Sequence, residues 1–351
     1  MKTIILLALK IVQFLKPNNK RRGYSIENII IREYNTKDID QIIELNQRVF
    51  SKQEHFEIKR DRVWFEWKNL KNPFGESIII VSENENKEIV GSRIFWAWKF
   101  KIRMNEFLAY QPIDTVVDPN YQGEGLFYKM TKKALDIALE KNSSFIFNFP
   151  NQNSLPGYLN LGWSYVSKLI WYVKIKNPGY VFNRNKKAES LSDLKNYKIT
   201  EEKIKDIKFK DNFDGKVKAT KSFSFIKWRY IDHPFFNYGI ITYKKNKKEI
   251  CGIFSINNIG NYREMFVVDI IGDYRLIEGL LKKVNEAAKE FNVSVVYILR
   301  NPYFNDLQMF KSGYIKLKNK NLVCLPLNLC LEGKLLNYNE WEMFGGLHDA
   351  L

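Results

Sequence analysis

Cysteine and histidine are scarce in this sequence, and their scarcity excludes several classes of site. The 351 residues include three cysteines, whose spacing gives neither a disulfide framework nor a metal-ligand pattern. We therefore predict no bound metal and a reducing, cytoplasmic setting. The three histidines (His55, His233 and His348) are far apart, and none has a nearby cysteine or a serine in a nucleophile-like arrangement. We expect them to be surface or loop residues.

The sequence also lacks a long apolar run. Residues 3–9 are apolar, but Lys10 interrupts the run before it is long enough to span a bilayer. No small-residue cleavage site follows, which argues against a secretory signal. Residues 1–24 instead form a segment with lysines on one helical face, and residues 1–22 fit a peripheral contact with an anionic membrane at its inner face. Packing of this helix on its own domain fits the pattern equally well.

Acidic residues are outnumbered by basic ones, 39 against 56, which gives a net charge of +17. Such a field attracts nucleic acid, an anionic membrane or a polyanionic cofactor. No zinc-finger spacing, basic-region heptad or aromatic RNA-binding signature accompanies the charge, which disfavours nucleic acid as a partner. A hydrophobic content of 45% over this length indicates a folded protein with room for two domains.

Strands and helices alternate through the first half of the chain. The patterns predict strands at 29–34, 77–82, 88–98, 107–117, 144–149 and 165–175, and helices at 38–50, 60–70 and 122–141. We divide the chain into an N-terminal segment (1–24), a catalytic unit (25–175), a linker (176–195), a second unit (196–332) and a C-terminal segment (333–351).

The second unit repeats the first. Residues 64–91 align without gaps on residues 225–252, and the matches continue in order through the rest of both units. The recurring pairs include Trp67 with Trp228, Pro73 with Pro234, Gly91 with Gly252, Asn151 with Asn301, and Gly162 with Gly313. Such self-similarity indicates an ancient duplication.

A glycine-containing loop between an expected strand and an expected helix distinguishes the first unit. Residues 116–127 read Val-Val-Asp-Pro-Asn-Tyr-Gln-Gly-Glu-Gly-Leu-Phe, and the corresponding part of the second unit lacks the second glycine. Glycines let the backbone approach an anion, and a helix N-terminus offers unpaired N–H groups and partial positive charge. The candidate phosphate-binding residues are Gln122, Gly123, Glu124, Gly125, Leu126 and Phe127.

A second motif follows at a compatible distance. Its matching positions are Asn151, Ser154, Tyr158, Asn160, Gly162 and Trp163. Together the two motifs make residues 29–175 resemble the GNAT superfamily of CoA-dependent N-acyltransferases, whose signatures are Gln/Arg-x-x-Gly-x-Gly/Ala and Asn-x-x-Ala-x-x-x-Tyr-x-Lys-x-Gly-Phe. Phe127 departs from the small residue that the first signature places last.

The resemblance implies an α/β fold of two tandem GNAT-like units, each a mixed, mostly antiparallel twisted sheet flanked by helices. The second unit would be a degenerate copy, so we expect a single active site in the first. Tandem arrangements of this kind also occur in N-myristoyltransferases, mycothiol synthase and the Fem transferases. The implied cofactor is acetyl-CoA or another acyl-CoA, with its pantetheine arm beside Thr115, Val116 and Val117.

Three side chains are candidates for the chemistry. The family position implies that Tyr158 protonates the leaving thiolate, although a core tyrosine that caps a loop is an equally good interpretation. Asp114 is the leading general base or amine-orienting group, because a carboxylate in an apolar strand needs a partner or a function; a lysine partner would explain it as well. Asn151 would hold the cofactor or brace its loop, and its recurrence in the second unit favours bracing.

We therefore predict an N-acetyltransferase that acts on a primary amine by direct attack on the thioester. A bacterial amino sugar in surface-glycan assembly is the acceptor suggested by analogy with related tandem chains. One alternative is a Fem-like aminoacyl transferase that uses charged tRNA, which the positive charge would also favour. The other is a catalytically inactive tandem-GNAT binding protein.

Overall fold

The computed structural model describes residues 28–50, 59–179, 188–205, 207 and 214–348. The amphipathic segment expected at residues 1–24 and the loop histidine His55 lie outside the described residues. Among the described residues, no helix has both the length and the apolar composition that a membrane crossing requires.

The first half follows the predicted order of strands and helices. Its elements are β1 (Ile30–Glu33), α2 (Ile39–Phe50), α3 (Arg62–Asn69), β2 (Ile78–Glu83), β3 (Ile89–Ile102), β4 (Asn105–Val117), α4 (Leu126–Glu140), β5 (Phe145–Asn148), α5 (Leu155–Asn160) and β6 (Ser164–Ile175). Side-chain caps fix where two of the helices begin. The Asp61 carboxylate accepts a hydrogen bond from the Trp64 N–H at the start of α3, and Asn35 caps the short turn that leads into α2.

The second half repeats this order after two short strands and two short helices. Its elements are β7 (Ala188–Ser190), α6 (Glu201–Lys205), β8 (Lys218–Ala219), α7 (Phe223–Ile226), β9 (Tyr238–Lys245), β10 (Lys248–Ile259), β11 (Tyr262–Gly272), α8 (Ile277–Glu290), β12 (Val295–Leu299), α9 (Asp306–Lys311), β13 (Ile315–Pro326) and α10 (Glu332–Leu335). Within the expected linker at 176–195, residues 188–190 form β7, because they pair with the edge of β10.

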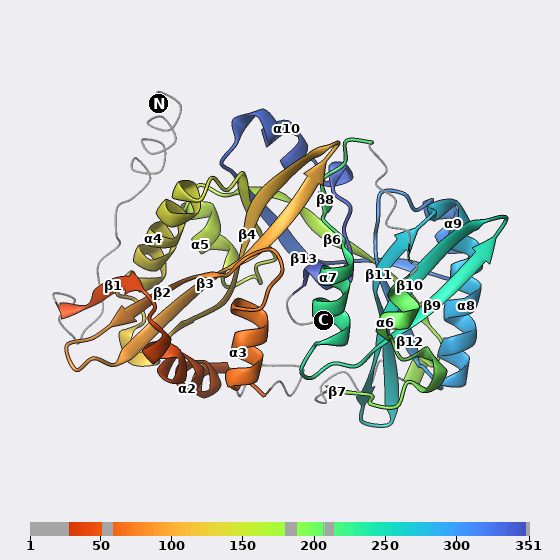
Figure 1. Cartoon of the computed structure of the whole chain (residues 1–351), viewed down its shortest axis with the longest axis horizontal. Helices are drawn as coiled ribbons and strands as arrows, with labels where there is room; N and C mark the ends of the chain where they lie inside the picture. The colour runs from red at the N-terminus through yellow and green to blue at the C-terminus, as the bar shows by residue number, and fades with distance from the viewer. Residues whose placement is uncertain (1–27, 51–58, 180–187, 206, 208–213, 349–351) are drawn as a thin grey trace.

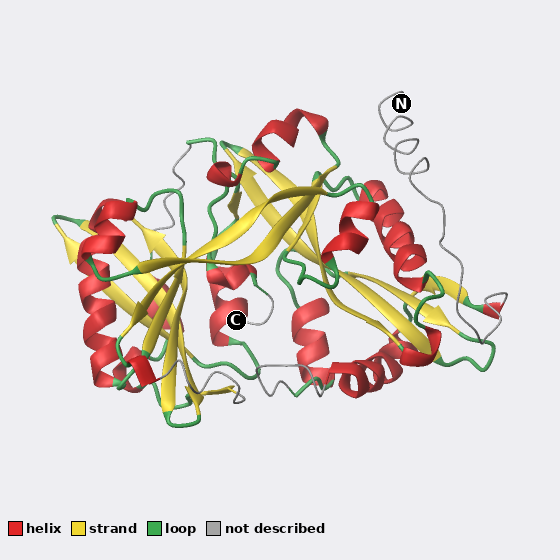
Figure 2. Ribbon diagram, turned by 180° about the vertical axis from the view of Figure 1, so that it is seen from behind, coloured by secondary structure: helices red, strands yellow, loops and turns green. Residues whose placement is uncertain are grey.

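The described strands form a single twisted, open sheet of 13 strands with helices against it (Figures 1 and 2). Most neighbours are antiparallel, and the parallel pairs are β4–β5 and β11–β12. This is the mixed α/β architecture that the sequence predicts. We expected a sheet in each unit, but the last strands of the two halves cross over: β13 pairs with β5, and β6 pairs with β12. The crossing joins both halves into one sheet.

Two matching tryptophans tie the halves together at a second place. Trp67 Nε1 donates to the Trp228 carbonyl at 2.9 Å, and Trp228 Nε1 donates to the Trp67 carbonyl at 2.9 Å. The rings stack with centroids 5.1 Å apart. Exchange of identical contacts between matching positions is the pattern of a two-fold interface. Both residues are buried, as expected for core packing.

His233 lies in a loop, as predicted, but its side chain is buried against Trp64 and Trp67. Its Nδ1 accepts hydrogen bonds from the backbone N–H groups of Phe235 and Phe236, at 3.2 and 2.9 Å. Burial lowers the pKa of the His233 imidazole well below its usual range, with the charges of Arg229 and Lys68 adding to the effect. His233 is therefore a neutral structural residue.

Candidate active site

A gap between the parallel strands β4 and β5 forms the centre of the candidate site. The two strands pair only at Ala109–Phe145 and Tyr110–Ile146. Beyond Tyr110, β4 pairs with β3 alone, while β5 pairs with β13 along its whole length on its other side. The C-terminal part of β4 therefore has an open edge, to which an extended ligand could add as a strand.

A β-bulge interrupts β4 at this open edge. Ser92 pairs with Val116 and Ile94 pairs with Ile113, so Asp114 and Thr115 together lie opposite the single residue Arg93. Asp114 adopts a left-handed backbone conformation with φ of 43°, which aspartate tolerates better than most residues. A bulge leaves an extra residue out of the regular ladder and redirects side chains, and bulges are common next to active sites.

The Asp114 carboxylate is held by two cations. Its Oδ1 lies 2.8 Å from Arg60 Nη1, and its Oδ2 lies 2.7 Å from Lys68 Nζ. All three side chains are largely buried, with exposed fractions of 9% for Asp114, 11% for Arg60 and 2% for Lys68. The lysine partner considered from the sequence is present, and an arginine accompanies it. This geometry favours an orienting role for Asp114 over proton abstraction.

The glycine loop lies at the N-terminus of α4. Gly123 and Gly125 have φ of 88° and 72°, and a Cβ added at either position would meet nothing within 4 Å. Gly125 is the N-cap of α4 and supplies no side-chain hydrogen bond, so no capping side chain satisfies the first N–H groups of the helix. The Gln122 side chain donates to the Val117 carbonyl at 3.2 Å and fixes the loop to the end of β4. These features fit a bound phosphate group.

A cleft of about 450 Å³ opens beside the bulge. Its lining includes five of the residues predicted from the sequence, namely Asp114, Thr115, Phe127, Asn151 and Tyr158. The other predicted cofactor residues do not line it: Leu126 and Val116 are buried in the core, while Val117, Gln122, Gly123, Glu124 and Gly125 occupy the end of β4 and the adjoining loop.

Tyr158 on α5 also lines the cleft. The Tyr158 hydroxyl accepts a hydrogen bond of 2.5 Å from Asn148 Nδ2, at the end of β5. Its ring packs edge-on against Phe127 and Trp163, with centroids 5.9 and 4.8 Å away. Because Asn148 is a donor in this bond, the phenolic proton remains available for donation to another group.

Comparison with known proteins assigns the fold. The family model described as an acetyltransferase (GNAT) domain matches residues 30–166. Residues 30–166, which include the bulge, the glycine loop and Tyr158, therefore match a GNAT acetyltransferase domain. This match supports an N-acyltransferase. No curated protein matches the sequence.

Solved structures resemble the chain in fold. A probable N-acyltransferase from Enterococcus faecalis matches with a TM-score of 0.57 and 10% identity, over 86% of this chain and 73% of its own. A GCN5-related N-acetyltransferase from Anabaena variabilis gives 0.57 and 12%, over 86% and 74%. Saccharomyces cerevisiae N-myristoyltransferase with bound myristoyl-CoA gives 0.53 and 11%, over 88% and 81%.

Phe127, the position that departs from the GNAT signature, packs beside a glycine of α5. A Cβ at Gly157 would lie 3.3 Å from Phe127 Cε1, so the absence of a side chain on α5 leaves room for the ring. The opposite side of the Phe127 ring contacts the Arg93 guanidinium, whose Cζ lies 4.6 Å from the ring centroid. Phe127 therefore shapes the cleft.

Asn151 braces the turn before α5. Its Oδ1 accepts from the backbone N–H groups of Asn153 and Ser154, at 3.0 and 2.9 Å. Asn301, the matching residue in the second half, accepts from the Tyr303 N–H at 3.1 Å in the same way. The shared contact supports the bracing role.

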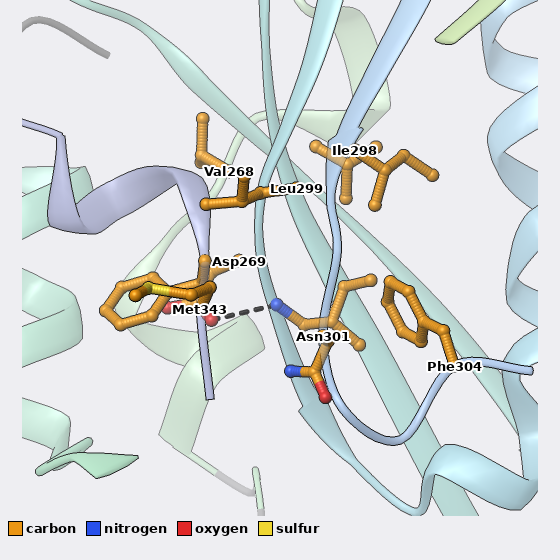
Figure 3. Close-up of a pocket in the computed structure, with 10 residues that line it drawn as sticks. Val268, Asp269, Ile298, Leu299, Asn301, Phe304 and Met343 are labelled. Carbon is orange, nitrogen blue, oxygen red and sulfur yellow. Dashed lines mark hydrogen bonds between the residues drawn. The ribbon is translucent and has the colours of Figure 1, made fainter. Parts of the chain in front are cut away.

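The corresponding gap in the second half is closed. Four residue pairs join β11 to β12, from Glu264–Val295 to Val267–Ile298, where two pairs join β4 to β5. The C-terminal segment covers the opening beyond these four pairs. Its Met343 lies beside the end of β11 and lines a pocket of only about 10 Å³ (Figure 3).

Charged side chains fix the C-terminal segment in this position. Lys221 Nζ lies 2.7 Å from Asp269 on β11 and 3.1 Å from Glu342 on the segment. Burial raises the pKa of the Asp269 carboxyl, and its ion pair with Lys221 opposes that effect. Among its described residues, the second half therefore has no open gap between β11 and β12 to match the one between β4 and β5.

The same C-terminal segment continues to the cleft of the GNAT domain. His348 lines the cleft, where its ring stacks on Phe149 at 6.1 Å and its Nε2 contacts Lys320 Nζ. Arg229 Nη2 donates to the His348 carbonyl at 3.2 Å. His348 is thus a loop residue, as predicted, and it brings the C-terminal segment into the cleft.

Sequence reasoning missed several other cleft residues. They are Arg60, Lys68, Arg93, Asn148 and Lys320. Arg93 carried a usable signal, since it is a cation directly before the apolar run 94–98 of β3. Lys68 carried none, because it follows Trp67 near the end of α3 and resembles an exposed helix lysine.

Proposed function

We propose that the protein is an acyl-CoA-dependent N-acyltransferase that transfers an acetyl group to a primary amine of a small-molecule acceptor. One observation carries the proposal: the bulged, open edge of β4 and Phe127 at the start of α4 line one cleft, and the glycine loop directly precedes Phe127 in the chain. The acyl-CoA supplies the activated thioester. The likeness to an N-myristoyltransferase that holds myristoyl-CoA supports the same type of donor here.

The chain has a place for each part of this donor. The N–H groups at the start of α4 and the bare loop around Gly123 and Gly125 would take the pyrophosphate. Thr115 to Val117 would pair with the pantetheine arm as an added strand. A backbone N–H at the bulge would donate to the thioester carbonyl and stabilise negative charge on its oxygen.

The remaining residues would manage protons and charge. Attack requires a neutral amine, and the buried cations Arg60 and Lys68 disfavour a protonated amine nearby. Asp114, fixed between them, would orient the acceptor. Tyr158 would donate its phenolic proton to the departing thiolate. An amino sugar of bacterial surface glycans remains the candidate acceptor class by analogy with related tandem chains.

Release of free thiol from acetyl-CoA, measured with a panel of primary amines, tests the proposal. We expect amine-dependent release by the wild-type protein, together with an N-acetylated product detected by mass spectrometry. Binding of acetyl-CoA without transfer to any amine would favour the inactive binding protein instead. Failure to bind acetyl-CoA would contradict the proposal and favour the tRNA-dependent alternative.

A further inference from the structure

We propose that Arg93 binds a carboxylate group of the reacting molecules, so that the acceptor amine or the transferred acyl group carries a carboxylate. This inference rests on the proposed function and specifies its substrate class. Arg93 is 0% exposed, yet it lines the cleft. Its recorded hydrogen bond runs from Nη1 to the Thr115 hydroxyl.

The unpaired side of the guanidinium is the one that suits a carboxylate. Nε and Nη2 of Arg93 are both buried and have no hydrogen-bond partner in the described part of the chain. These two nitrogens form one edge that can donate two parallel hydrogen bonds. Arg275 uses that edge on Asp273, with Nε at 2.8 Å from Oδ1 and Nη2 at 2.6 Å from Oδ2. In Arg93 the same edge has no partner.

The surroundings of Arg93 increase the cost of leaving this edge unpaired. The guanidinium lies against aromatic rings, with its Cζ 4.6 Å from the Phe127 centroid, 5.3 Å from Tyr158 and 5.5 Å from Phe95. Cation–π contacts stabilise the charge over the ring faces but do not satisfy the in-plane N–H groups. A buried hydrogen-bond donor without an acceptor lowers the stability of the folded protein. Native proteins retain such a donor where a ligand supplies the acceptor.

The fold itself does not require an arginine at this position. The offset that relates Trp67 to Trp228 also relates Arg93 to Phe254, which occupies the matching place on β10 and is 0% exposed. The half with a closed gap thus has an apolar side chain there, and the half with an open cleft has a cation. Asp114, whose two oxygens contact Arg60 and Lys68, makes no hydrogen bond with Nε or Nη2 of Arg93.

The position of Arg93 beside Tyr158 and the bulge places the carboxylate close to the reaction centre. Both sources of the carboxylate fit this position. An amino acid presents its carboxylate a short distance from its amine, and a dicarboxylic acyl group presents one a short distance from its thioester. In either case the carboxylate would fix the distance and orientation of the reacting atoms.

Two matched comparisons in wild type and Arg93→Met distinguish these sources. The first compares succinyl-CoA with acetyl-CoA by calorimetric titration. The second compares thiol release from acetyl-CoA with glycine against methylamine, and with phenylalanine against phenethylamine. We expect the wild type to prefer the carboxylate-bearing member in one comparison, and Arg93→Met to lose about ten- to hundredfold of that preference. Lys71→Met, which removes an exposed cation outside the cleft, should keep it.

Thermal unfolding of the ligand-free variants separates this role from a structural one. Because Arg93 is a buried charge without an ionic partner in the described chain, Arg93→Met should unfold at the same temperature as wild type or higher. Arg93→Lys keeps the charge without the two-donor edge, and it should also lose the preference. Unchanged preference in both variants would overturn the inference.

A failure of the proposed function would be recognised separately. If the wild type binds neither acyl-CoA, the proposed function fails. The inference would then be judged by thermal stabilisation with succinate and with glycine alone. Equal shifts in wild type and Arg93→Met would overturn it, and a shift that depends on Arg93 would support it. An equal loss of affinity for acetyl-CoA and succinyl-CoA in Arg93→Met would also overturn it, because Arg93 would then contact the cofactor itself.

Discussion

Gly125→Glu is expected to weaken binding of acetyl-CoA by at least about 100-fold, which corresponds to about 3 kcal/mol. Gly125 is the N-cap of α4, and a Cβ at this position would project into open space. A glutamate there would place its carboxylate where the pyrophosphate is to bind. The backbone at φ of 72° adds a stability cost of about 1–2 kcal/mol, which calorimetry and thermal unfolding can measure separately from affinity.

Gly162→Glu is the matched control for this variant. Gly162 has φ of 81°, and a Cβ there also meets nothing within 4 Å, so the strain and added charge are similar. Gly162 follows the C-terminal end of α5, where a helix presents carbonyl groups rather than the N–H groups that would bind a phosphate. We expect it to lose comparable stability while retaining its affinity for acetyl-CoA. If the two variants bind equally, the glycine loop is not the phosphate site.

Tyr158→Phe is expected to lower kcat by about 100-fold or more, the usual contribution of a general acid. The affinity for acetyl-CoA should change little, because the ring contacts with Phe127 and Trp163 remain. The variant leaves the Asn148 amide without the hydroxyl that now accepts its hydrogen bond. Steady-state kinetics combined with calorimetry would separate the effect on turnover from the effect on binding.

Tyr314→Phe provides the control for removing a buried hydroxyl. The Tyr314 hydroxyl is buried in the second half and has no hydrogen-bond partner among the described residues. Its removal should leave both kcat and affinity unchanged. A Tyr158→Phe protein with wild-type turnover would show that Tyr158 is the loop-capping core tyrosine that the sequence equally allowed.

The sequence predicted those features that short stretches of consecutive residues determine. They are the apolar run of β3, the periodicity of α4 and the turn around Gly123 and Gly125. They gave the α/β class and the position of the glycine loop. Alignment of the second half on the first showed that the fold does not require the glycine loop.

The features that the sequence did not predict depend on contacts between segments that are far apart in the chain. Nothing in the local pattern of β6 or β13 reveals that they exchange partners, because either pairing buries the same apolar side chains. The double ion pair of Asp114 joins α3 and the residues before it to β4. His348 reaches the cleft only because the C-terminal segment first closes the gap beside β11.

The number of acyl-CoA molecules bound per chain is the most direct test of the account. A calorimetric titration of wild-type protein with acetyl-CoA should give one site per chain, because β4 and β5 separate at the cleft while β11 and β12 stay paired and covered. That site should disappear in Gly125→Glu. Two sites per chain, or no site in the wild type, would contradict a single active site in the GNAT domain.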